Sequence, residues 1–260
     1  MQKGFWNKLK AEWYRRGLEY SGFPRSAMAV ILPRAQNCKS FLDVGAGCGS
    51  LAIPLARAGK TVTALDASQA MINILNEDMK KEGLKGIKPV VSEWDKAELK
   101  AHDAVLCANV PTLLSEPEKT IKRMDALARK AVFIIENADP QGDKFYYREL
   151  YPLLFNKPFG ARADYFKTYS ALHSLGIFAN VEIIEYDFDQ PFRDLDEAVE
   201  FWKEYIGIVT EEHDRKLREF LGNRLVKRKG VLFARFHKKS AVMWWTKEKK
   251  GLDPTLLTGY

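Results

Sequence analysis

The stretch that decides the fold is Phe41-Leu42-Asp43-Val44-Gly45-Ala46-Gly47-Cys48-Gly49, an apolar run that ends in an acid and three alternating glycines. A short apolar run predicts a buried strand, and glycines directly after it predict a tight turn into a helix. Because glycine has no Cβ, its backbone adopts positive φ at little cost and approaches a ligand closely. This layout indicates a strand-loop-helix site for a nucleotide-like ligand.

The spacing of the glycines narrows the choice of ligand. A loop that binds the pyrophosphate of a dinucleotide reads GxGxxG. Here the pattern is DxGxGxG, with Asp43 close to the place that a phosphate would take. Like charges in a poorly solvated loop repel each other. The loop therefore favours a cationic or zwitterionic ligand over a pyrophosphate.

Strands and helices alternate between residues 40 and 138, which predicts a parallel sheet with helices on both faces. We expect strands at 40–44, 61–65, 88–91, 102–108 and 131–135, and helices at 50–58, 68–81 and 117–128. Ser68 is a suitable N-cap for the second helix, and Gly59 ends the first.

Residues 40–138 resemble the class I S-adenosylmethionine (SAM) methyltransferases, and among them the type 11/25 domain group. The resemblance implies an α/β fold with a doubly wound, mostly parallel, seven-stranded Rossmann-like sheet that has helices on both faces. It also implies an enzyme that takes a methyl group from SAM and releases S-adenosylhomocysteine. An N-terminal helical segment at 1–35 and a helical insertion before the last strand would be additions to that domain.

By this resemblance, backbone groups of the glycine loop contact the methionine part and the ribose of SAM. The loop residues concerned are Gly45, Ala46, Gly47 and Gly49. Asp43 would help to hold the ammonium group, directly or through water.

A second acid, Asp66, ends the next predicted strand and lies 23 positions after Asp43. This distance is close to the roughly 20 residues that place an acid on ribose hydroxyls. Ala67, Ser68 and Met71 would flank the adenine and the ribose.

The third and fourth strands add the remaining residues that the resemblance assigns to the cofactor. After the third strand, Glu93 would accept a hydrogen bond from the exocyclic amine of adenine, and the Trp94 amide would donate to the ring. Asp95 is the competing acid for this role, because boundaries read from sequence err by two to four residues. Asn109 follows the fourth strand, at the family's position beside the sulfonium.

Catalytic residues do not stand out, because methyl transfer needs a dedicated base only if the acceptor must lose a proton early. Asn109 is not followed by the Pro-Pro-aromatic signature of amide and nucleobase N-methyltransferases, which lowers the expectation of a DNA or glutamine substrate. Candidate groups near the acceptor are Asn109, Tyr146, Tyr147, Glu149, His173 and Tyr14.

The segments outside residues 40–138 are read as additions to one domain. Residues 1–35 predict an amphipathic helix and connector, which either packs against the sheet or forms a lid over the cofactor. Further along we expect an aromatic cap at 141–175, a strand at 181–188, two inserted helices within 195–226, and a final hairpin. That hairpin would pair 231–236 with 241–246 and turn at 237–239. The cap and the inserted helices would form the acceptor pocket.

Composition bounds the function classes. The net charge is +7, and residues 215–250 carry thirteen Lys and Arg against two acids. This basic region either binds nucleic acid or lines the solvated face of a helix, and we favour the second interpretation because aromatics are not interleaved with the charges. The spacing of cysteines and histidines predicts no metal site, and no apolar run is long enough for a membrane span. We expect a cytoplasmic methyltransferase with a small-molecule acceptor. The alternatives are an RNA methyltransferase or a non-catalytic SAM-binding protein.

Overall fold

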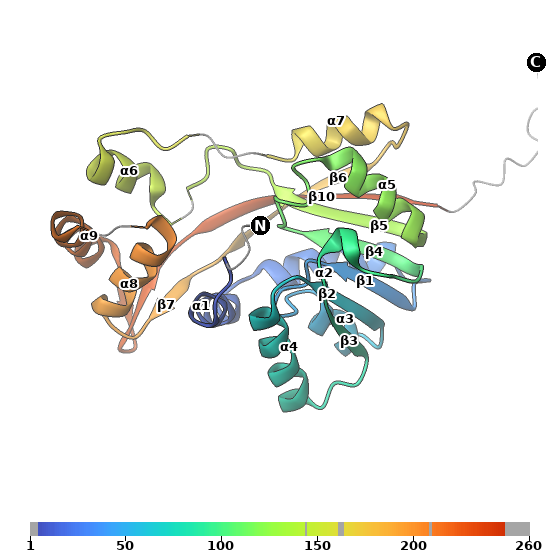
Figure 1. Ribbon diagram of the computed structural model, residues 1–260, viewed down its shortest axis with the longest axis horizontal. Coiled ribbons are helices and arrows are strands. Elements are labelled where there is room, and N and C mark those ends of the chain that lie inside the picture. Colours follow the sequence, from blue (N-terminus) through green and yellow to red (C-terminus); the bar gives the residue numbers. More distant parts are fainter. Residues whose placement is uncertain (1–4, 144, 161–163, 208–209, 248–260) are drawn as a thin grey trace, which may run out of the picture.

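One seven-stranded sheet organises the molecule, with strand order β3-β2-β1-β4-β5-β10-β6 (Figure 1). The computed structural model describes residues 5–143, 145–160, 164–207 and 210–247. The strands are β1 (Ser40–Val44), β2 (Thr61–Asp66), β3 (Ile87–Val91), β4 (His102–Ala108), β5 (Ala128–Asn137), β6 (Asn180–Asp187) and β10 (His237–Thr246). Strand β10 is antiparallel to both of its neighbours, and the other pairs are parallel. The predicted mostly parallel, seven-stranded sheet is confirmed.

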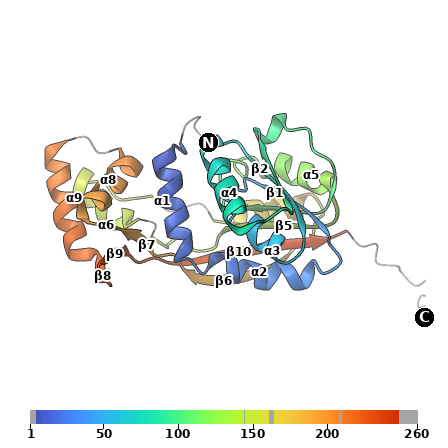
Figure 2. The same ribbon diagram turned by 90° about the horizontal axis from the view of Figure 1, so that it is seen from below.

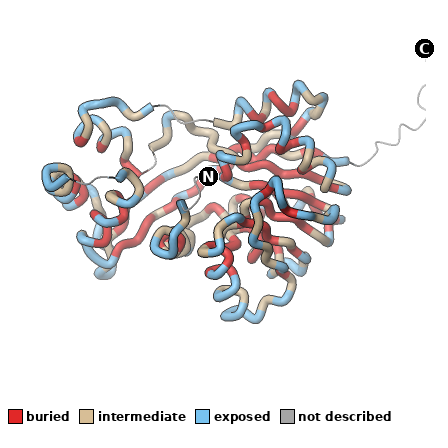
Figure 3. The backbone as a smooth tube through the Cα atoms, viewed as in Figure 1, coloured by how far each residue is buried: buried red, intermediate tan, exposed pale blue. Residues whose placement is uncertain are grey.

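Helices cover both faces of this sheet (Figures 1 and 2). One face packs against α2 (Phe23–Arg34), α3 (Ala52–Arg57) and α4 (Gln69–Glu82), and the other against α5 (Pro117–Leu127) and α7 (Phe166–Ser174). Successive side chains of a strand point to opposite faces of the sheet. Phe41 therefore packs in the core beneath α2, α3 and α4, and Leu42 packs in the core beneath α5 and α7. Figure 3 shows buried residues running along the central strands, as expected for a sheet covered on both sides.

The helix signals in the sequence act as predicted. The Ser68 side chain accepts a hydrogen bond from the Met71 amide at 3.3 Å and so caps α4. Gly59 has φ +76° directly after the last turn of α3, a conformation in which glycine is favoured. The five strands expected within 40–138 are all present, each with bounds within three residues of the prediction.

A second group of elements, which we call the added unit, extends away from the carboxyl edge of the sheet (Figure 1). It contains the helices α6 (Tyr147–Phe155), α8 (Leu195–Ile206) and α9 (Glu211–Arg224), and a small sheet of order β7-β9-β8. The strands of that sheet are β7 (Gln190–Phe192), β8 (Val226–Arg228) and β9 (Val231–Ala234). Its separate core is built around Trp202, Phe201 and Phe192.

The N-terminal helix α1 (Lys8–Glu19) lies between the two parts and contacts both α4 and β7 (Figure 2). The buried Trp13 indole donates to the Glu197 carboxylate of α8 at 3.2 Å, and the Arg16 guanidinium pairs with the same carboxylate at 2.5 Å. A cation and an indole on one helix thus attach the N-terminal segment to the added unit.

Three predictions outside residues 40–138 need correction. The hairpin is wrong, because His237–Lys239 belong to β10 and β9 pairs with β7 and β8 instead. The segment 1–35 forms two helices rather than one helix and a connector. Within 141–175, α6 packs in the added unit while α7 packs on the main sheet, so these residues do not form one cap. The two inserted helices before the last strand are present as α8 and α9.

Candidate functional site

The glycine loop after β1 has the geometry that its sequence predicts. Gly45, Gly47 and Gly49 all adopt positive φ, at +73°, +56° and +89°. A Cβ at Gly45 would collide with Val110, and one at Gly49 would lie 2.6 Å from Leu75, so both positions exclude side chains by packing. A Cβ at Gly47 would meet no described atom within 4 Å. The middle glycine therefore borders open space in which a ligand can approach the backbone.

Asp66 at the end of β2 is bound to this loop. Its Oδ2 accepts a hydrogen bond from the Gly47 amide at 2.9 Å, and its Oδ1 accepts one from the Ser68 amide at 2.8 Å. Burial raises the pKa of Asp66, and these backbone donors oppose that effect. The carboxylate therefore connects the glycine loop to the first turn of α4.

Asp43, the acid before the glycines, is buried beneath the same loop. It is 2 % exposed, and its Oδ2 has no hydrogen-bond partner among the described residues. Burial raises the pKa of Asp43 to about 8, and the nearby Asp66 charge contributes in the same direction. Two carboxyl groups this close in a poorly solvated place favour a cation or a hydrogen-bond donor. The structure thus brings together the two acids that the sequence pointed to.

The residues predicted to flank the ribose sit at the start of α4. Ala67 is exposed, and the Ser68 hydroxyl lies 3.5 Å from the carbonyl oxygen of Trp6 in the N-terminal segment. The Met71 side chain is buried against Cys48 and Ala11. This corner of the site is therefore covered by the segment before and within α1.

Of the residues predicted to contact adenine, the two acids lie at the surface and the tryptophan is buried. Glu93 pairs with Lys96 at 2.7 Å and Asp95 with Lys119 at 3.1 Å, and all four side chains are largely exposed. The Trp94 ring is buried in the core of the α5 face. These carboxylates make ion pairs at the surface, whereas Asp43 and Asp66 meet at the glycine loop.

Asn109 lies where β4 ends, next to the glycine loop. Its amide donates to the Ile135 carbonyl of β5 at 2.8 Å, and its φ of +56° is left-handed, a region that Asn tolerates better than most residues. The following residue, Val110, fills the space beside Gly45. Asn109 is exposed at the carboxyl edge of the sheet, as expected for a residue that faces a ligand.

The other acceptor candidates are scattered. Tyr146 is buried in the added unit, where its hydroxyl accepts from the Arg235 amide at 3.1 Å. Tyr147 packs against the rings of Tyr151 and Phe159. These two tyrosines therefore lie with the added unit and not with Asn109.

Two further candidates lie on the surface and one at the loop. His173 is exposed in the last turn of α7 beside Phe178, and Glu149 forms an exposed ion pair with Arg224 at 2.9 Å. Tyr14 of α1 lies close to Ser50, directly after the glycine loop. Burial raises the pKa of Tyr14 far above its ordinary value, so its phenol stays protonated.

One carboxylate at this edge was not among the predicted residues. Glu136 is the second-last residue of β5, which lies next to β4, the strand that Asn109 follows. Its Oε2 is buried without a partner among the described residues, and burial raises its pKa to about 7. An acid at the end of a strand is visible in the sequence, but its unpaired oxygen is not.

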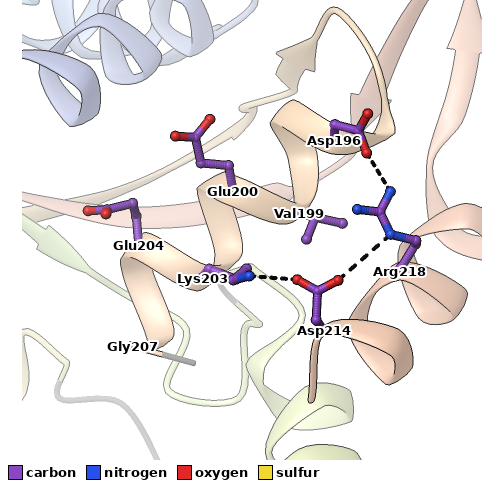
Figure 4. Close-up of a pocket in the computed structure, with 8 residues that line it drawn as sticks. All are labelled: Asp196, Val199, Glu200, Lys203, Glu204, Gly207, Asp214 and Arg218. Atoms are coloured by element: carbon purple, nitrogen blue, oxygen red, sulfur yellow. Dashed lines mark hydrogen bonds and ion pairs between the residues drawn. The ribbon is translucent and has the colours of Figure 1, made fainter. Parts of the chain in front are cut away.

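A pocket elsewhere in the molecule is already occupied by its own ion pairs (Figure 4). It lies between α8 and α9, where Lys203 pairs with Asp214 at 2.6 Å and Arg218 pairs with Asp196 at 2.5 Å. These charged side chains satisfy each other, so the glycine loop remains the stronger candidate for the functional site.

Comparison with known proteins places a known domain in this chain. Residues 41–131 match the family model described as a methyltransferase domain. The chain therefore carries a methyltransferase domain at these residues. The matched residues include the glycine loop, Asp66 and Asn109. The solved structure of magnesium protoporphyrin IX methyltransferase from Synechocystis, with bound S-adenosylhomocysteine, shares the fold with a TM-score of 0.52 at 15% identity. That likeness covers 93% of this chain and 89% of the other.

The curated relatives differ in the share of this chain that they match. An uncharacterized protein of Haemophilus influenzae is 28% identical over 82% of this chain and 78% of its own length. Two others match only part of the chain. A protein named probable ribosomal RNA small subunit methyltransferase A, from Methanosphaera stadtmanae, is 29% identical over 41% of this chain and 40% of its own. A ubiquinone biosynthesis O-methyltransferase of Methylocella silvestris is 35% identical over 36% of each.

The residues present fit SAM on observations of this structure. Asp43 offers a buried, unpaired oxygen to a cationic ligand, and Gly47 leaves open backbone beside it. In the part of the chain that the structure describes, no group of three or more His, Cys, Asp or Glu could hold a metal ion. No described helix has the length and apolar character needed to cross a bilayer.

Proposed function

We propose that this methyltransferase transfers the methyl group of SAM to a small-molecule acceptor at the carboxyl edge of the main sheet. The observation that carries the proposal is the buried, unpaired Oδ2 of Asp43 beneath a glycine loop whose middle residue borders open space. A ligand with a cationic sulfur and an ammonium group suits such a site, because a cation stabilises the ionised form of Asp43, whose pKa burial raises to about 8. A pyrophosphate would bring negative charge next to Asp66 and to a carboxyl group that could not then ionise.

Each part of the site has a role in this proposal. Asp43 would hold the ammonium side of SAM, the amides of the glycine loop its methionine part and ribose, and Asp66 the ribose hydroxyls. Bound SAM supplies an activated methyl group. The contribution of the protein is alignment of the acceptor in a water-poor pocket, an effect worth up to about 7 to 11 kcal/mol in good intramolecular models.

The N-terminal segment and the added unit would enclose the acceptor. Trp6 and Tyr14 pack on the cluster formed by Cys48 and Met71, next to the predicted ribose position. We assign this segment the role of a lid. The acceptor would enter between the lid, the end of β4 and the elements that lead into the added unit.

The small-molecule assignment is supported by the state of the basic residues. Several cations of residues 215–250 are engaged in ion pairs with acids of the added unit. The pairs are Lys216 with Glu212, Arg218 with Asp196, Arg224 with Glu149, and Arg228 with Asp189. Such pairs reduce the positive field that a phosphate backbone needs.

Titration calorimetry with S-adenosylhomocysteine and with NAD tests the proposal directly. We expect binding of S-adenosylhomocysteine and no measurable binding of NAD, because of the carboxylate beneath the loop. Binding of NAD alone would refute the proposal.

An RNA acceptor is the second candidate, favoured by the ribosomal RNA methyltransferase among the partial relatives and by the basic residues of β8. RNA affinity that falls steeply between 50 and 200 mM salt would support it. Absence of RNA binding, or affinity that does not change with salt, would count against it. The third candidate, a non-catalytic SAM-binding protein, would be ended by methyl transfer to any acceptor.

A further inference from the structure

Glu136 occupies a place at the carboxyl edge that the cofactor residues leave unassigned. It follows Ile135, whose carbonyl accepts the Asn109 amide at 2.8 Å, and it pairs in the sheet with Ala241 of β10. Its carboxyl group therefore stands at the end of β5, on the strand next to the predicted methyl position.

One oxygen of this carboxyl group lacks a hydrogen-bond donor among the described residues. The side chain lies close to the hydroxyl of Thr168, a buried residue of α7, which acts to lower the pKa of the carboxyl group. Its Oε2 is buried and makes no hydrogen bond with any described residue. A buried carboxylate oxygen without a donor is costly, typically by about 1 to 3 kcal/mol. Such an atom, on the strand next to the predicted methyl position, indicates a donor supplied by a ligand.

Glu136 and Asp43 both lie close enough to Cys107 of β4 to affect its pKa. The pKa of the Cys107 thiol on β4 is raised by burial and then by the charges of Asp43 and Glu136. Both carboxyl groups thus act on one residue near the end of β4, from the strands on either side. Burial raises the pKa of Glu136 itself to about 7, and Asp164 before α7 adds to this.

We propose that Glu136 is the acceptor-side carboxylate of this enzyme: it binds the N–H or O–H of the attacking nucleophile and receives its proton. The inference rests on the proposed function and deepens it, because it names the acceptor chemistry. The nucleophile's lone pair forms the bond to the methyl carbon, the carbon–sulfur bond breaks with its electrons left on sulfur, and the proton passes to Oε2 of Glu136.

This arrangement selects among acceptors. A neutral amine or a hydroxyl compound can donate to Oε2, and its proton has a place to go. A carboxylate acceptor has no proton to give and meets two negative groups, Glu136 and Asp164. The acceptor class is therefore an amine or an alcohol or phenol.

The first test needs no acceptor. The pKa of Glu136 is measured by NMR on protein labelled with ¹³C at Glu carboxyl groups, with the signal assigned by Glu136→Gln. The titration is carried out with S-adenosylhomocysteine, which has a neutral sulfur, and with sinefungin, which carries an ammonium group where SAM has its methyl. We expect a pKa lower by at least about one unit with sinefungin, because a cation a few ångströms away favours the carboxylate.

The results that would overturn this inference differ from those that would refute the proposed function. As the control, the NMR signal of the exposed Glu98 should be the same with both ligands at a given pH. If both ligands bind and Glu136 titrates identically with each, Glu136 does not face the methyl position and the inference is overturned. If neither ligand binds, the proposed function itself fails, and the inference falls with it.

The second test uses turnover. Primary amines and phenols are offered with SAM, and each acceptor that the parent methylates is then given to Glu136→Gln and to the control Glu98→Gln. We expect Glu136→Gln to slow transfer by about 100-fold or more, which is typical for loss of a general base. Its affinity for S-adenosylhomocysteine should stay unchanged, and the ionisation near pH 7 should vanish from the pH–rate profile. Equal transfer rates in Glu136→Gln and the parent would overturn the inference.

Discussion

Three carboxylates at one edge of the sheet have three different surroundings. Asp66 receives backbone donors from the glycine loop and α4, whereas Asp43 and Glu136 each keep one buried oxygen unpaired among the described residues. The sequence pointed to Asp43 and Asp66 through their spacing from the glycines. Glu136 has no such motif, so only the three-dimensional structure reveals its unpaired oxygen.

We predict that Asp66→Ala weakens the binding of S-adenosylhomocysteine. The substitution removes the acceptor of the Gly47 and Ser68 amides and the group assigned to the ribose, so affinity for S-adenosylhomocysteine should fall by about 10-fold or more. Asp103→Ala is the matched control, since Asp103 also accepts backbone amides, from Lys39 and Ser40, before β1. It should lower stability without changing ligand affinity. Equal affinity in Asp66→Ala and the parent, measured by calorimetry, would show that the ribose position is misplaced.

Among the elements, α1 is joined to α8 through the buried carboxylate of Glu197. Burial opposes the ionisation of Glu197, but hydrogen bonds from Arg16, the Arg193 amide and Trp13 outweigh it and lower the pKa to about 2. The ionised form is thus favoured in the folded protein. Its stabilisation is fully present above the unfolded pKa of about 4.5 and is lost as the pH falls towards 2.

Glu197→Gln should therefore destabilise the protein by about 3 kcal/mol at pH 7, with a difference from the parent that shrinks as the pH falls from 4.5 to 2. Denaturant unfolding at several pH values measures this. Glu182→Gln, which breaks a more exposed pair with Arg34, should cost no more than about 1 kcal/mol. A pH-independent difference for Glu197→Gln would contradict the assigned ion pair.

The elements also show where sequence patterns suffice. The strands predicted within residues 40–138 are short apolar runs, and polar residues or glycines follow them. Their positions could therefore be predicted from the sequence. The small sheet was missed because β8 is exposed along its length and β7 contains Pro191, which weakens any strand signal. The hairpin prediction failed because polar residues 237–239 suggest a turn, although they continue β10 as it pairs with β6. Long-range pairing of β7 with β9 has no local signature.

For the whole molecule, the cores on the two faces of the main sheet and the core of the added unit lie on either side of the carboxyl edge of that sheet. The strands β6 and β10 lead directly into and out of the added unit, and α1 packs against both parts. Nothing in the sequence before residue 40 or after residue 138 determines this arrangement locally, because it arises from contacts such as that of Trp13 with Glu197. The residues predicted to bind the cofactor and the connections to the added unit therefore share one edge of the main sheet.

This arrangement predicts where ligand binding should stiffen the molecule. S-adenosylhomocysteine should slow amide hydrogen exchange in the glycine loop and, if the N-terminal segment acts as the proposed lid, in residues 8–19 as well. Exchange in α9 should stay unchanged, which serves as the internal control. Protection of the glycine loop without any change in 8–19 would show that the N-terminal segment is a structural brace and not a lid.

A crystal structure with S-adenosylhomocysteine will show whether the cofactor binds at the glycine loop. We expect the ligand at the carboxyl edge, with its amino group near Asp43, its ribose on Asp66 and its sulfur facing the ends of β4 and β5. A ligand bound away from Asp43 and Asp66, or a phosphate group bound at the glycine loop in its place, would refute the proposed site.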